Sequence, residues 1–270
     1  MKKFTAFVLL LIFAFSFSNA GAQSKKKPFV IFDVIGGYNL PLFDMGGSIK
    51  GVFDFSGYGT SNAIGTGFNV KFSVLTRDMF QLRIYGAFLY TQAWSSEGNA
   101  YLIGGVNGNN EIIPGWPSTY YSYPVVTGGE SYMRLNIPSF GVGCEAAVYA
   151  DKDSRSSFNF GLDADMSIIT GRAYNTYPTR EVFYTIPSTV RFGLGLNVMY
   201  DIKVADFLGI NVGTRFQWHN LLGKSSKSAD ENWYMPLNDD AVFAQNYSSG
   251  SRNIATLNFF TGVSFFIGKR

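Results

Sequence analysis

Hydrophobic and polar residues alternate along most of this chain. In the stretch 258–267, Phe259 and Val263 fall on one face of an extended strand, and Asn258 and Ser264 fall on the other. A period of two residues is typical of a β-strand whose two faces meet different surroundings, and it excludes a buried helix. A terminal strand of this kind is typical of a closed barrel.

The same alternation predicts seven further strands. They lie at about 29–40, 65–75, 80–91, 132–149, 157–169, 189–200 and 208–219. Together with the terminal strand this makes eight, and each is long enough to cross a membrane at a tilt, which takes roughly nine to eleven residues. If the segment 100–113, with its Asn107-Gly108 turn, also inserted, the barrel would have ten strands.

The alternation changes phase in the strand 132–149, at Pro138. Because proline cannot donate a hydrogen bond to a neighbouring strand, a β-bulge or bend at this residue is the natural explanation. Alternatively the phase is continuous, and Arg134 faces outward above the bilayer.

The connections between predicted strands alternate in length. Long connections span about 44–62, 93–129, 171–187 and 220–253, whereas those near Thr76, near Asp151 and at 201–206 are short. Outer-membrane barrels place short turns in the periplasm and long loops outside. The pattern therefore predicts an all-β fold: an eight-stranded antiparallel up-and-down transmembrane barrel with both termini in the periplasm.

Composition agrees with a membrane barrel. Aromatic residues reach 17%, charged residues only 15%, and there are 30 glycines. No internal run approaches the ~18 apolar residues of a spanning helix, so the apolar residues are spread in alternation. A soluble sandwich or lipocalin-like barrel would also alternate, but the aromatic strand ends, the glycine-rich charged faces and the loop lengths favour the membrane.

Residues 1–22 have the features of a signal peptide, which leaves 23–270 as the barrel domain. Lys2 and Lys3 precede an apolar run, and small residues follow, with cleavage expected after Ala22. The single cysteine, Cys144, excludes an internal disulfide and a lipoprotein anchor. The net charge of +3 and the cluster Lys25 to Lys27 fit a solvated mature N-terminus, so no nucleic-acid partner is expected.

If the polar faces point inward, the barrel interior carries charges of both signs. This predicted lumen network comprises Asp33, Lys71, Arg83, Glu145, Asp163, Asp165, Arg191 and Arg215, with Arg134 as a further candidate. An eight-stranded barrel is only wide enough for side chains to fill it, so the charges should pair across the interior and leave no aqueous channel. Glycines on the same faces would make room for the long arginines. A porin is therefore disfavoured.

Catalytic chemistry has one candidate, His219, the only histidine. Some eight-stranded barrels modify lipid A with a histidine, a serine and a carboxylate near the outer rim, and Ser188 and Ser251 could lie at neighbouring strand ends. The nearest carboxylates, Asp230 and Glu231, are in a long loop. A histidine serving as an interfacial polar residue is the simpler interpretation, so we expect no catalytic site.

Metal and cofactor binding is not expected either. One histidine and one cysteine exclude the common zinc sets. Asp230, Glu231, Asp239 and Asp240 could offer oxygen ligands to calcium, but they lack the spacing of a dedicated loop.

The long connections are rich in aromatic residues. They carry Trp94, Tyr101, Trp116, Tyr120, Tyr121, Tyr123, Tyr174, Tyr177, Trp233 and Tyr234. Rigid rings among Gly, Ser and Asn resemble recognition surfaces for a protein or glycan ligand. They could equally cover the barrel mouth as a plug or lie at the lipid interface.

Two short motifs resemble known barrels. Gly262, Phe265 and Ile267 resemble the C-terminal signal by which bacterial outer-membrane barrels are passed to their assembly machinery, although Phe260 occupies the signal's polar position and Arg270 ends the chain. The run Tyr-Met-Arg-Leu-Asn-Ile-Pro at 132–138 resembles the Leu-x-Ile-Pro segment of PorT-like outer-membrane barrel domains of Bacteroidota, a Gram-negative group.

These resemblances imply a small, monomeric, OmpA-like barrel without catalytic residues, in contact with outer-membrane lipids and the assembly machinery. The expected function is a non-enzymatic structural or surface-interaction role at the cell surface through the long extracellular loops. Two alternatives remain at this point: an accessory component of a protein secretion apparatus, as in the PorT branch, and an outer-membrane lipid-modifying enzyme.

Overall fold

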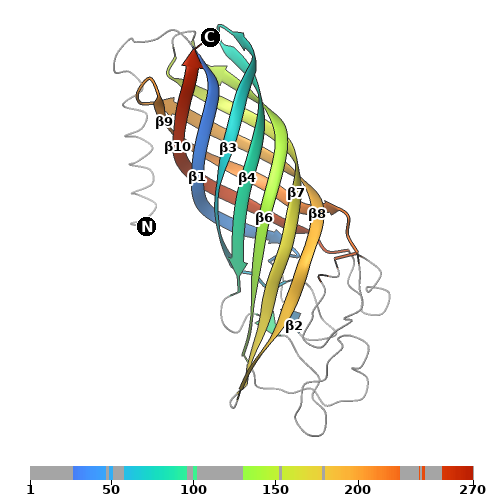
Figure 1. The fold of residues 1–270 in the computed structure, drawn as a ribbon. Coiled ribbons are helices and arrows are strands. Elements are labelled where there is room, and N and C mark those ends of the chain that lie inside the picture. The colour runs from blue at the N-terminus through green and yellow to red at the C-terminus, as the bar shows by residue number, and fades with distance from the viewer. Residues whose placement is uncertain are drawn as a thin grey trace.

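Eight antiparallel strands form a closed barrel (Figure 1). They are β1 (Pro28–Phe43), β3 (Asn62–Arg77), β4 (Phe80–Trp94), β6 (Glu130–Tyr149), β7 (Ser156–Tyr177), β8 (Arg180–Lys203), β9 (Leu208–Leu222) and β10 (Ile254–Lys269). The structure is a computed structural model and describes residues 27–46, 49–50, 58–95, 100–101, 130–151, 154–177, 180–225, 237, 239–240 and 251–269. Among these residues no helix is long and apolar enough to cross a membrane.

Each strand pairs with its neighbour along the chain, and β10 closes the ring by pairing with β1 from Pro28↔Lys269 to Phe43↔Ile254. All eight predicted strands are present, so the up-and-down topology is confirmed. The only described residues of the segment 100–113 form β5 (Ala100–Tyr101), which pairs with β2 (Ile49–Lys50) outside the barrel. The ring is therefore complete with eight strands.

The expected bulge at Pro138 is wrong. Tyr90 stands opposite Pro138 in an unbroken β4–β6 register, and Arg134 is exposed on the outer face. The alternative of a continuous phase is correct. The apparent slip has a physical cause: Leu135 and Ile137 point inward and are fully buried. The barrel interior becomes apolar at this level, so the hydrophobic residues change faces while the backbone phase does not.

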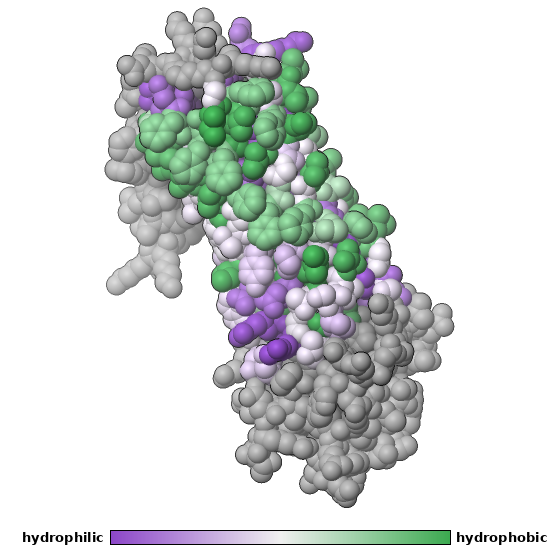
Figure 2. Space-filling view, viewed as in Figure 1, coloured by the Kyte–Doolittle hydropathy of each residue, from purple (hydrophilic) through white to green (hydrophobic). Residues whose placement is uncertain are grey.

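The outer surface of the barrel is apolar. Large exposed hydrophobic side chains include Val34, Phe68, Ile84, Phe140, Val142, Phe158, Leu162, Phe192, Leu196, Phe259, Val263 and Ile267. On the face that Figure 2 shows, hydrophobic residues gather over much of the barrel wall. Water-soluble proteins do not expose apolar patches of this extent, and the charged faces point into the lumen, so the lipocalin-like alternative is wrong. The fold is a transmembrane β-barrel.

A ladder of phenylalanine rings runs across this apolar outer surface. Phe68 lies 5.5 Å from Phe88, and Phe88 lies 5.1 Å from Phe140, measured between ring centroids. On the other side Phe32 lies 5.9 Å from Phe68 and 6.2 Å from Phe265. Cross-strand aromatic pairs of this kind stabilise neighbouring strands, here in β10, β1, β3, β4 and β6.

Three adjacent strands are longer than the others. β6, β7 and β8 have 20, 22 and 24 residues, whereas the remaining barrel strands have 15 or 16. β7 and β8 stay paired out to Tyr177↔Arg180, and β6 stays paired with β7 out to Glu130↔Thr176. The three strands thus continue beyond the barrel as a projecting sheet (Figure 1). We call residues 130–134, 172–177 and 180–185 the β6–β8 extension.

Candidate functional site: the filled barrel interior

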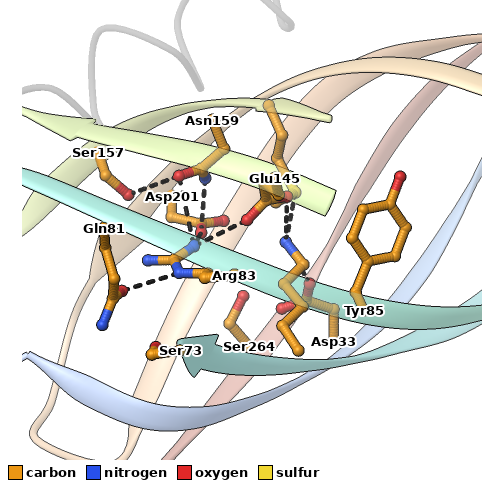
Figure 3. Close-up of polar contacts among 12 residues, drawn as sticks. Asp33, Ser73, Gln81, Arg83, Tyr85, Glu145, Ser157, Asn159, Asp201 and Ser264 are labelled. Carbon is orange, nitrogen blue, oxygen red and sulfur yellow. Dashed lines mark hydrogen bonds and ion pairs between the residues drawn. The ribbon is translucent and has the colours of Figure 1, made fainter. Parts of the chain in front are cut away.

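A buried ion-pair network occupies the end of the interior nearest the short turns (Figure 3). Lys71 Nζ lies 2.9 Å from Asp33 Oδ2 and 2.8 Å from Glu145 Oε2. Arg83 Nη1 lies 2.8 Å from the other Glu145 oxygen, Oε1, and 3.8 Å from Asp201 Oδ2. These residues come from β1, β3, β4, β6 and β8, so one network ties five of the eight strands together.

Neutral side chains complete the coordination of this network. Arg83 Nε donates to Gln81 Oε1 at 2.8 Å, and Arg83 Nη2 donates to the Tyr149 hydroxyl at 2.8 Å. Asn159 Nδ2 donates to Asp201 Oδ2 at 2.8 Å. Buried charges are tolerated only when their hydrogen-bonding capacity is largely met, and the guanidinium of Arg83 meets most of its own here.

The middle of the interior holds a second ion pair. Arg215 Nη2 lies 2.5 Å from Asp163 Oδ1, while the Tyr85 hydroxyl donates to Asp163 Oδ2 at 2.6 Å. A Cβ on Gly195 would lie 2.5 Å from Arg215 Nη2 and 2.7 Å from both carboxylate oxygens of Asp163. At this level of the barrel a glycine does make room for a long arginine, as the sequence predicts.

His219 belongs to a separate polar cluster in the same interior. Its Nδ1 lies 3.1 Å from Ser167 Oγ and its Nε2 lies 3.1 Å from Thr256 Oγ1. Ser167 in turn donates to Asp165 Oδ1 at 3.0 Å and lies 2.8 Å from Ser139 Oγ. Since the Ser167 proton goes to Asp165, Nδ1 must be the donor to Ser167, and Nε2 then accepts from Thr256.

The end of the interior nearest the long connections is closed by a segment of the β9–β10 connection. Arg191 on β8 binds Asp239 with Nε to Oδ2 at 2.9 Å and Nη2 to Oδ1 at 2.7 Å. Asn220 Nδ2 donates to Asp239 Oδ2 at 2.8 Å, and the Tyr58 hydroxyl donates to the Leu237 carbonyl at 2.8 Å. We call Leu237 and Asp239 the mouth segment.

Below the mouth segment the interior is apolar. The fully or almost fully buried side chains there are Met45, Met133, Leu135, Ile137, Ile169, Ile186, Leu237 and Ile254. At roughly 1.5–3 kcal/mol for each fully buried large apolar side chain, their burial contributes substantially to the stability of this end of the barrel.

Three ionisable side chains at the mouth, all outside the strands, have pKa values shifted by their own burial. Desolvation raises the pKa of the Tyr58 hydroxyl above its usual range. Desolvation also lowers the pKa of Arg252, whose guanidinium carbon lies 5.8 Å from the Tyr58 ring centroid. Lys224, which donates to Ser251 Oγ at 2.9 Å and Asn253 Oδ1 at 2.7 Å, has a pKa lowered chiefly by the same cause.

All eight residues of the predicted lumen network lie inside the barrel and are buried. They divide into separate groups: Asp33, Lys71, Arg83 and Glu145 at one end, Asp163 with Arg215 in the middle, Asp165 beside Ser167, and Arg191 with Asp239 at the mouth. Arg134, the further candidate, faces outward. The suggestion that Arg134 belongs to the lumen network is wrong, because the alternation of faces along β6 continues unbroken through Pro138.

Sequence reasoning missed several interior residues. The sequence pattern places Asp201 in a short turn, yet this residue lies in β8 and is 3% exposed. Asp201 follows Arg191 by an even number of positions, so the two residues share a face of the strand. Continuing the alternation from Arg191 would therefore have placed Asp201 inside the barrel. Asp239 is only a weak calcium candidate by sequence, and nothing in the sequence indicates that it pairs with Arg191. The apolar filling of the mouth has no sequence signal of its own either.

The residues considered as catalytic candidates do not meet. His219 is completely buried, whereas Ser188 and Ser251 are both exposed. The hydrogen-bonding partners of His219 are Ser167 and Thr256. Asp230 and Glu231 lie outside the described residues.

Within the described ranges no group of three or more His, Cys, Asp or Glu side chains is close enough to hold a metal ion.

Other predictions concern the chain ends and connections. Phe265 and Ile267 of the proposed assembly signal lie on the outer face, 38% and 57% exposed, and Gly262 packs against the β1 backbone at Val34. Trp94 and Tyr174 are strand residues on the outer face. Tyr101 and Tyr177 end β5 and β7. The signal peptide, Lys25 and Lys26, and the aromatic residues Trp116, Tyr120, Tyr121, Tyr123, Trp233 and Tyr234 lie outside the described residues, so predictions about them stay predictions.

Comparison with solved structures finds matches of low similarity. No family model and no curated protein matches the chain. Among solved structures, Neisserial surface protein A matches with 11% identity and a TM-score of 0.36, covering 88% of this chain and 97% of that one. Ail of Yersinia pestis matches with 10% identity and a TM-score of 0.36, covering 88% and 99%.

The outer membrane protease OmpT from Escherichia coli matches with 11% identity and a TM-score of 0.41, covering 88% of this chain and 97% of that one. These scores are low, so the membrane assignment stands on the barrel's own apolar belt and closed ring.

Proposed function

We propose that the protein is a non-enzymatic integral barrel of the outer membrane that acts at the cell surface through the β6–β8 extension and the long connections. The observation that carries this proposal is the extension itself. The other strands end near the barrel mouth, but β6, β7 and β8 continue as a paired sheet beyond it. A membrane span needs no such continuation, so the additional length points to an activity outside the bilayer.

The filled interior supports a role other than transport. Ion pairs, the His219 cluster, the apolar residues and the mouth segment occupy successive levels of the barrel. Eight-stranded barrels have interiors that side chains can fill, and open channels are found in larger ones. We expect no steady ion conductance from the protein in a planar bilayer.

The orientation follows from the connections. β3 and β4 are joined at 78–79, β6 and β7 at 150–155, and β8 and β9 at 204–207, all at the end opposite the extension. Short turns face the periplasm in outer-membrane barrels. The extension then faces the outside of the cell.

Cysteine labelling on intact cells tests the orientation. In a Cys144→Ser background, a cysteine at Thr176 in the extension should react with a membrane-impermeant maleimide. A cysteine at Asp78 in the β3–β4 turn should react only after the outer membrane is opened. Labelling of Asp78→Cys but not Thr176→Cys on intact cells would reverse the orientation and remove the surface role.

A shortened extension tests the surface role. Deleting residues 173–184 and joining β7 to β8 by Asn-Gly should leave a barrel that still migrates differently in gels before and after boiling. Wild type in lipid nanodiscs should bind at least one glycan or cell-surface protein on an array, and the shortened variant should lose that binding. Equal binding by both variants, or none by wild type, would contradict the proposal.

A role in protein secretion, as in PorT-like barrels, is the second candidate. It rests on the resemblance of the 132–138 run, in which Leu135 and Ile137 are buried in the apolar mouth, whereas Arg134 and Pro138 lie on the outer face. Packing alone thus accounts for the apolar part of the motif. The secretion role predicts that gentle detergent extraction recovers the barrel with periplasmic secretion proteins and that deletion impairs secretion. Recovery of the free barrel together with normal secretion would remove it.

A lipid-modifying activity has less support. Lipid at the outer surface does not reach His219, which is fully buried inside the ring. If the protein were such an enzyme, purified wild type would release acyl chains from labelled lipid A and His219→Ala would not. We expect no release from either.

A further inference from the structure

Three carboxylates and two cations share the buried network at the end of the lumen nearest the short turns (Figure 3). The carboxylates are Asp33, Glu145 and Asp201, and the cations are Lys71 and Arg83. Their side chains are at most 5% exposed, so water screens none of these charges effectively. With every group in its ordinary ionisation state, three negative and two positive charges leave the network with one negative charge in excess.

Both cations are committed to two of the three carboxylates. Glu145 receives one cation on each oxygen, with Lys71 Nζ at 2.8 Å and Arg83 Nη1 at 2.8 Å. Lys71 Nζ also lies 2.9 Å from Asp33 Oδ2. The excess negative charge therefore falls on the third carboxylate.

Asp201 is this third carboxylate, and no cation touches it. Its Oδ2 lies 3.8 Å from Arg83 Nη1, which is beyond hydrogen-bonding distance, and accepts a hydrogen bond from the neutral amide of Asn159 at 2.8 Å. Its Oδ1 is buried and has no hydrogen-bond donor among the described residues. An ionised carboxylate is strongly disfavoured in such a place, because burial without a paired cation removes its hydration and returns little.

The strands around Asp201 present these charges and otherwise neutral groups. Ser157 on β7 and Asn211 on β9 stand opposite Asp201 in the register. The amide of Asn211 donates to Ser264 Oγ on β10 at 2.9 Å. The charged groups that act on Asp201 come from β3, β1, β4 and β6, and they are Lys71, Asp33, Arg83 and Glu145.

Two lysines at the rim of this end are engaged elsewhere. Lys27, which precedes β1, donates to the backbone carbonyls of Arg77 and Asp78 in the β3–β4 turn. Lys203, near the end of β8, lies 3.4 Å from Asp206. Within the described residues neither lysine forms an ion pair with the network, so neither supplies the missing positive charge.

Asp33 completes the arrangement as a partner for Asp201. Its charge is one of those that act on Asp201, and its Oδ1 is buried without a hydrogen-bond donor among the described residues. Two buried carboxylates that act on each other hold one proton between them more readily than two negative charges. A proton on one of them also turns an acceptor into a donor.

We infer that the network is a proton-binding site, which holds one proton at neutral pH on the Asp201 carboxyl, shared with Asp33. The proton makes the network neutral. In the unfolded chain an aspartate is ionised at neutral pH, so the folded barrel binds one proton more than the unfolded chain does. Its stability therefore falls as the pH rises and the proton leaves. The site is independent of the surface role proposed above and of the orientation of the barrel.

Infrared spectroscopy of the mature barrel in lipid vesicles tests the proton directly. The spectrum of wild type at neutral pH, minus that of Asp201→Asn, should contain the carbonyl band of a protonated carboxyl group, and the band should shift in heavy water. Asp33→Asn leaves two negative and two positive charges, so it should release the proton and give the same difference band. The control Asp78→Asn, in the exposed β3–β4 turn, should give none.

Urea unfolding measures the consequence for stability. Once the proton begins to leave, the unfolding constant of wild type should rise relative to that of Asp201→Asn by about tenfold per pH unit, in a series from about pH 6 to about pH 9. Asp33→Asn should lack this rise, and Asp78→Asn should show it as wild type does. Absence of the difference band in both network variants, or the same pH dependence in wild type and both network variants, would overturn the inference. Because the two substitutions are tested separately, failure of one variant to assemble leaves the other as the test.

Discussion

Arg191 and Asp239 join the barrel wall to the segment that closes it. The guanidinium of Arg191, on β8, binds both oxygens of the Asp239 carboxylate, and the two side chains are only 4% and 0% exposed. A further hydrogen bond, from the Ser225 backbone N–H to Asp239 Oδ1 at 3.3 Å, adds to this contact. The pair therefore anchors the mouth segment to the barrel wall.

Replacing Arg191 by Gln should release the mouth segment, because Asp239 would keep a buried charge without its cation. Breaking a buried pair in this way costs about 3–5 kcal/mol, and opening the mouth is the easiest relief. Limited proteolysis should cut between 225 and 251 faster than in wild type, with the barrel intact. Lys224→Ala, which removes a partly exposed cation at the same rim, should be cut at the wild-type rate. Protection equal to wild type in Arg191→Gln would contradict this account.

Lys71→Met should destabilise the barrel by about 3–5 kcal/mol, since it leaves Asp33 buried without its ion-pair partner. Urea unfolding in lipid vesicles, followed by tryptophan fluorescence, measures the change. The double variant Asp33→Asn/Lys71→Met removes both charges and should recover at least ~1 kcal/mol of the loss. If the double variant is no more stable than Lys71→Met, the Asp33–Lys71 pair is not the cause.

Replacing either of two glycines on neighbouring strands by alanine should change the stability of the barrel by different amounts. A Cβ on Gly143 would lie 2.5 Å from Asp163 Cβ and 2.7 Å from Asp163 Cα, and it would also collide with the Leu162 carbonyl. Gly86→Ala meets nothing within 4 Å. Gly143→Ala should therefore lose about 1–3 kcal/mol of unfolding free energy, as overpacked sites do, and Gly86→Ala should change it little. The same urea titration measures the unfolding free energy of both variants. An unchanged value for Gly143→Ala would show that β6 and β7 can move apart to accommodate the added methyl group.

Ser167→Ala should destabilise the barrel without affecting any hydrolysis. It leaves the donor at His219 Nδ1 and the acceptor at Asp165 Oδ1 each without a partner, and each unsatisfied buried group costs about 1–3 kcal/mol. Ser251→Ala, at an exposed rim position, should be close to wild type in the same unfolding assay. Loss of a lipid hydrolase activity in Ser167→Ala would instead make this cluster catalytic.

Phe265→Ser should reduce assembly in cells more than it reduces stability. Phe265 is 38% exposed on the outer face and belongs to the proposed assembly signal, whereas Phe160, 52% exposed on β7, does not. Both substitutions remove one lipid-facing ring, so refolded proteins should unfold at similar urea concentrations. Quantitative blotting of the outer membrane should then show less Phe265→Ser than Phe160→Ser. Equal amounts would mean that the terminal residues carry no signal.

The sequence by itself determined the number of strands, their order and the face that each side chain occupies along most of their length. A period of two residues fixes which residues share a face, and alternating connection lengths fix which ends lie together. This is why the alternation alone places Lys71, Arg83 and Glu145 in one interior.

Only the tertiary structure decided which interior charges meet and at what height. Arg191 pairs with Asp239 because the β9–β10 connection turns back into the mouth, and no periodicity in a loop indicates such a return. Arg134 faces outward because β6 keeps its phase while the interior changes from polar to apolar. Register between strands and the path of the loops depend on contacts far apart in sequence, and a local pattern does not contain them.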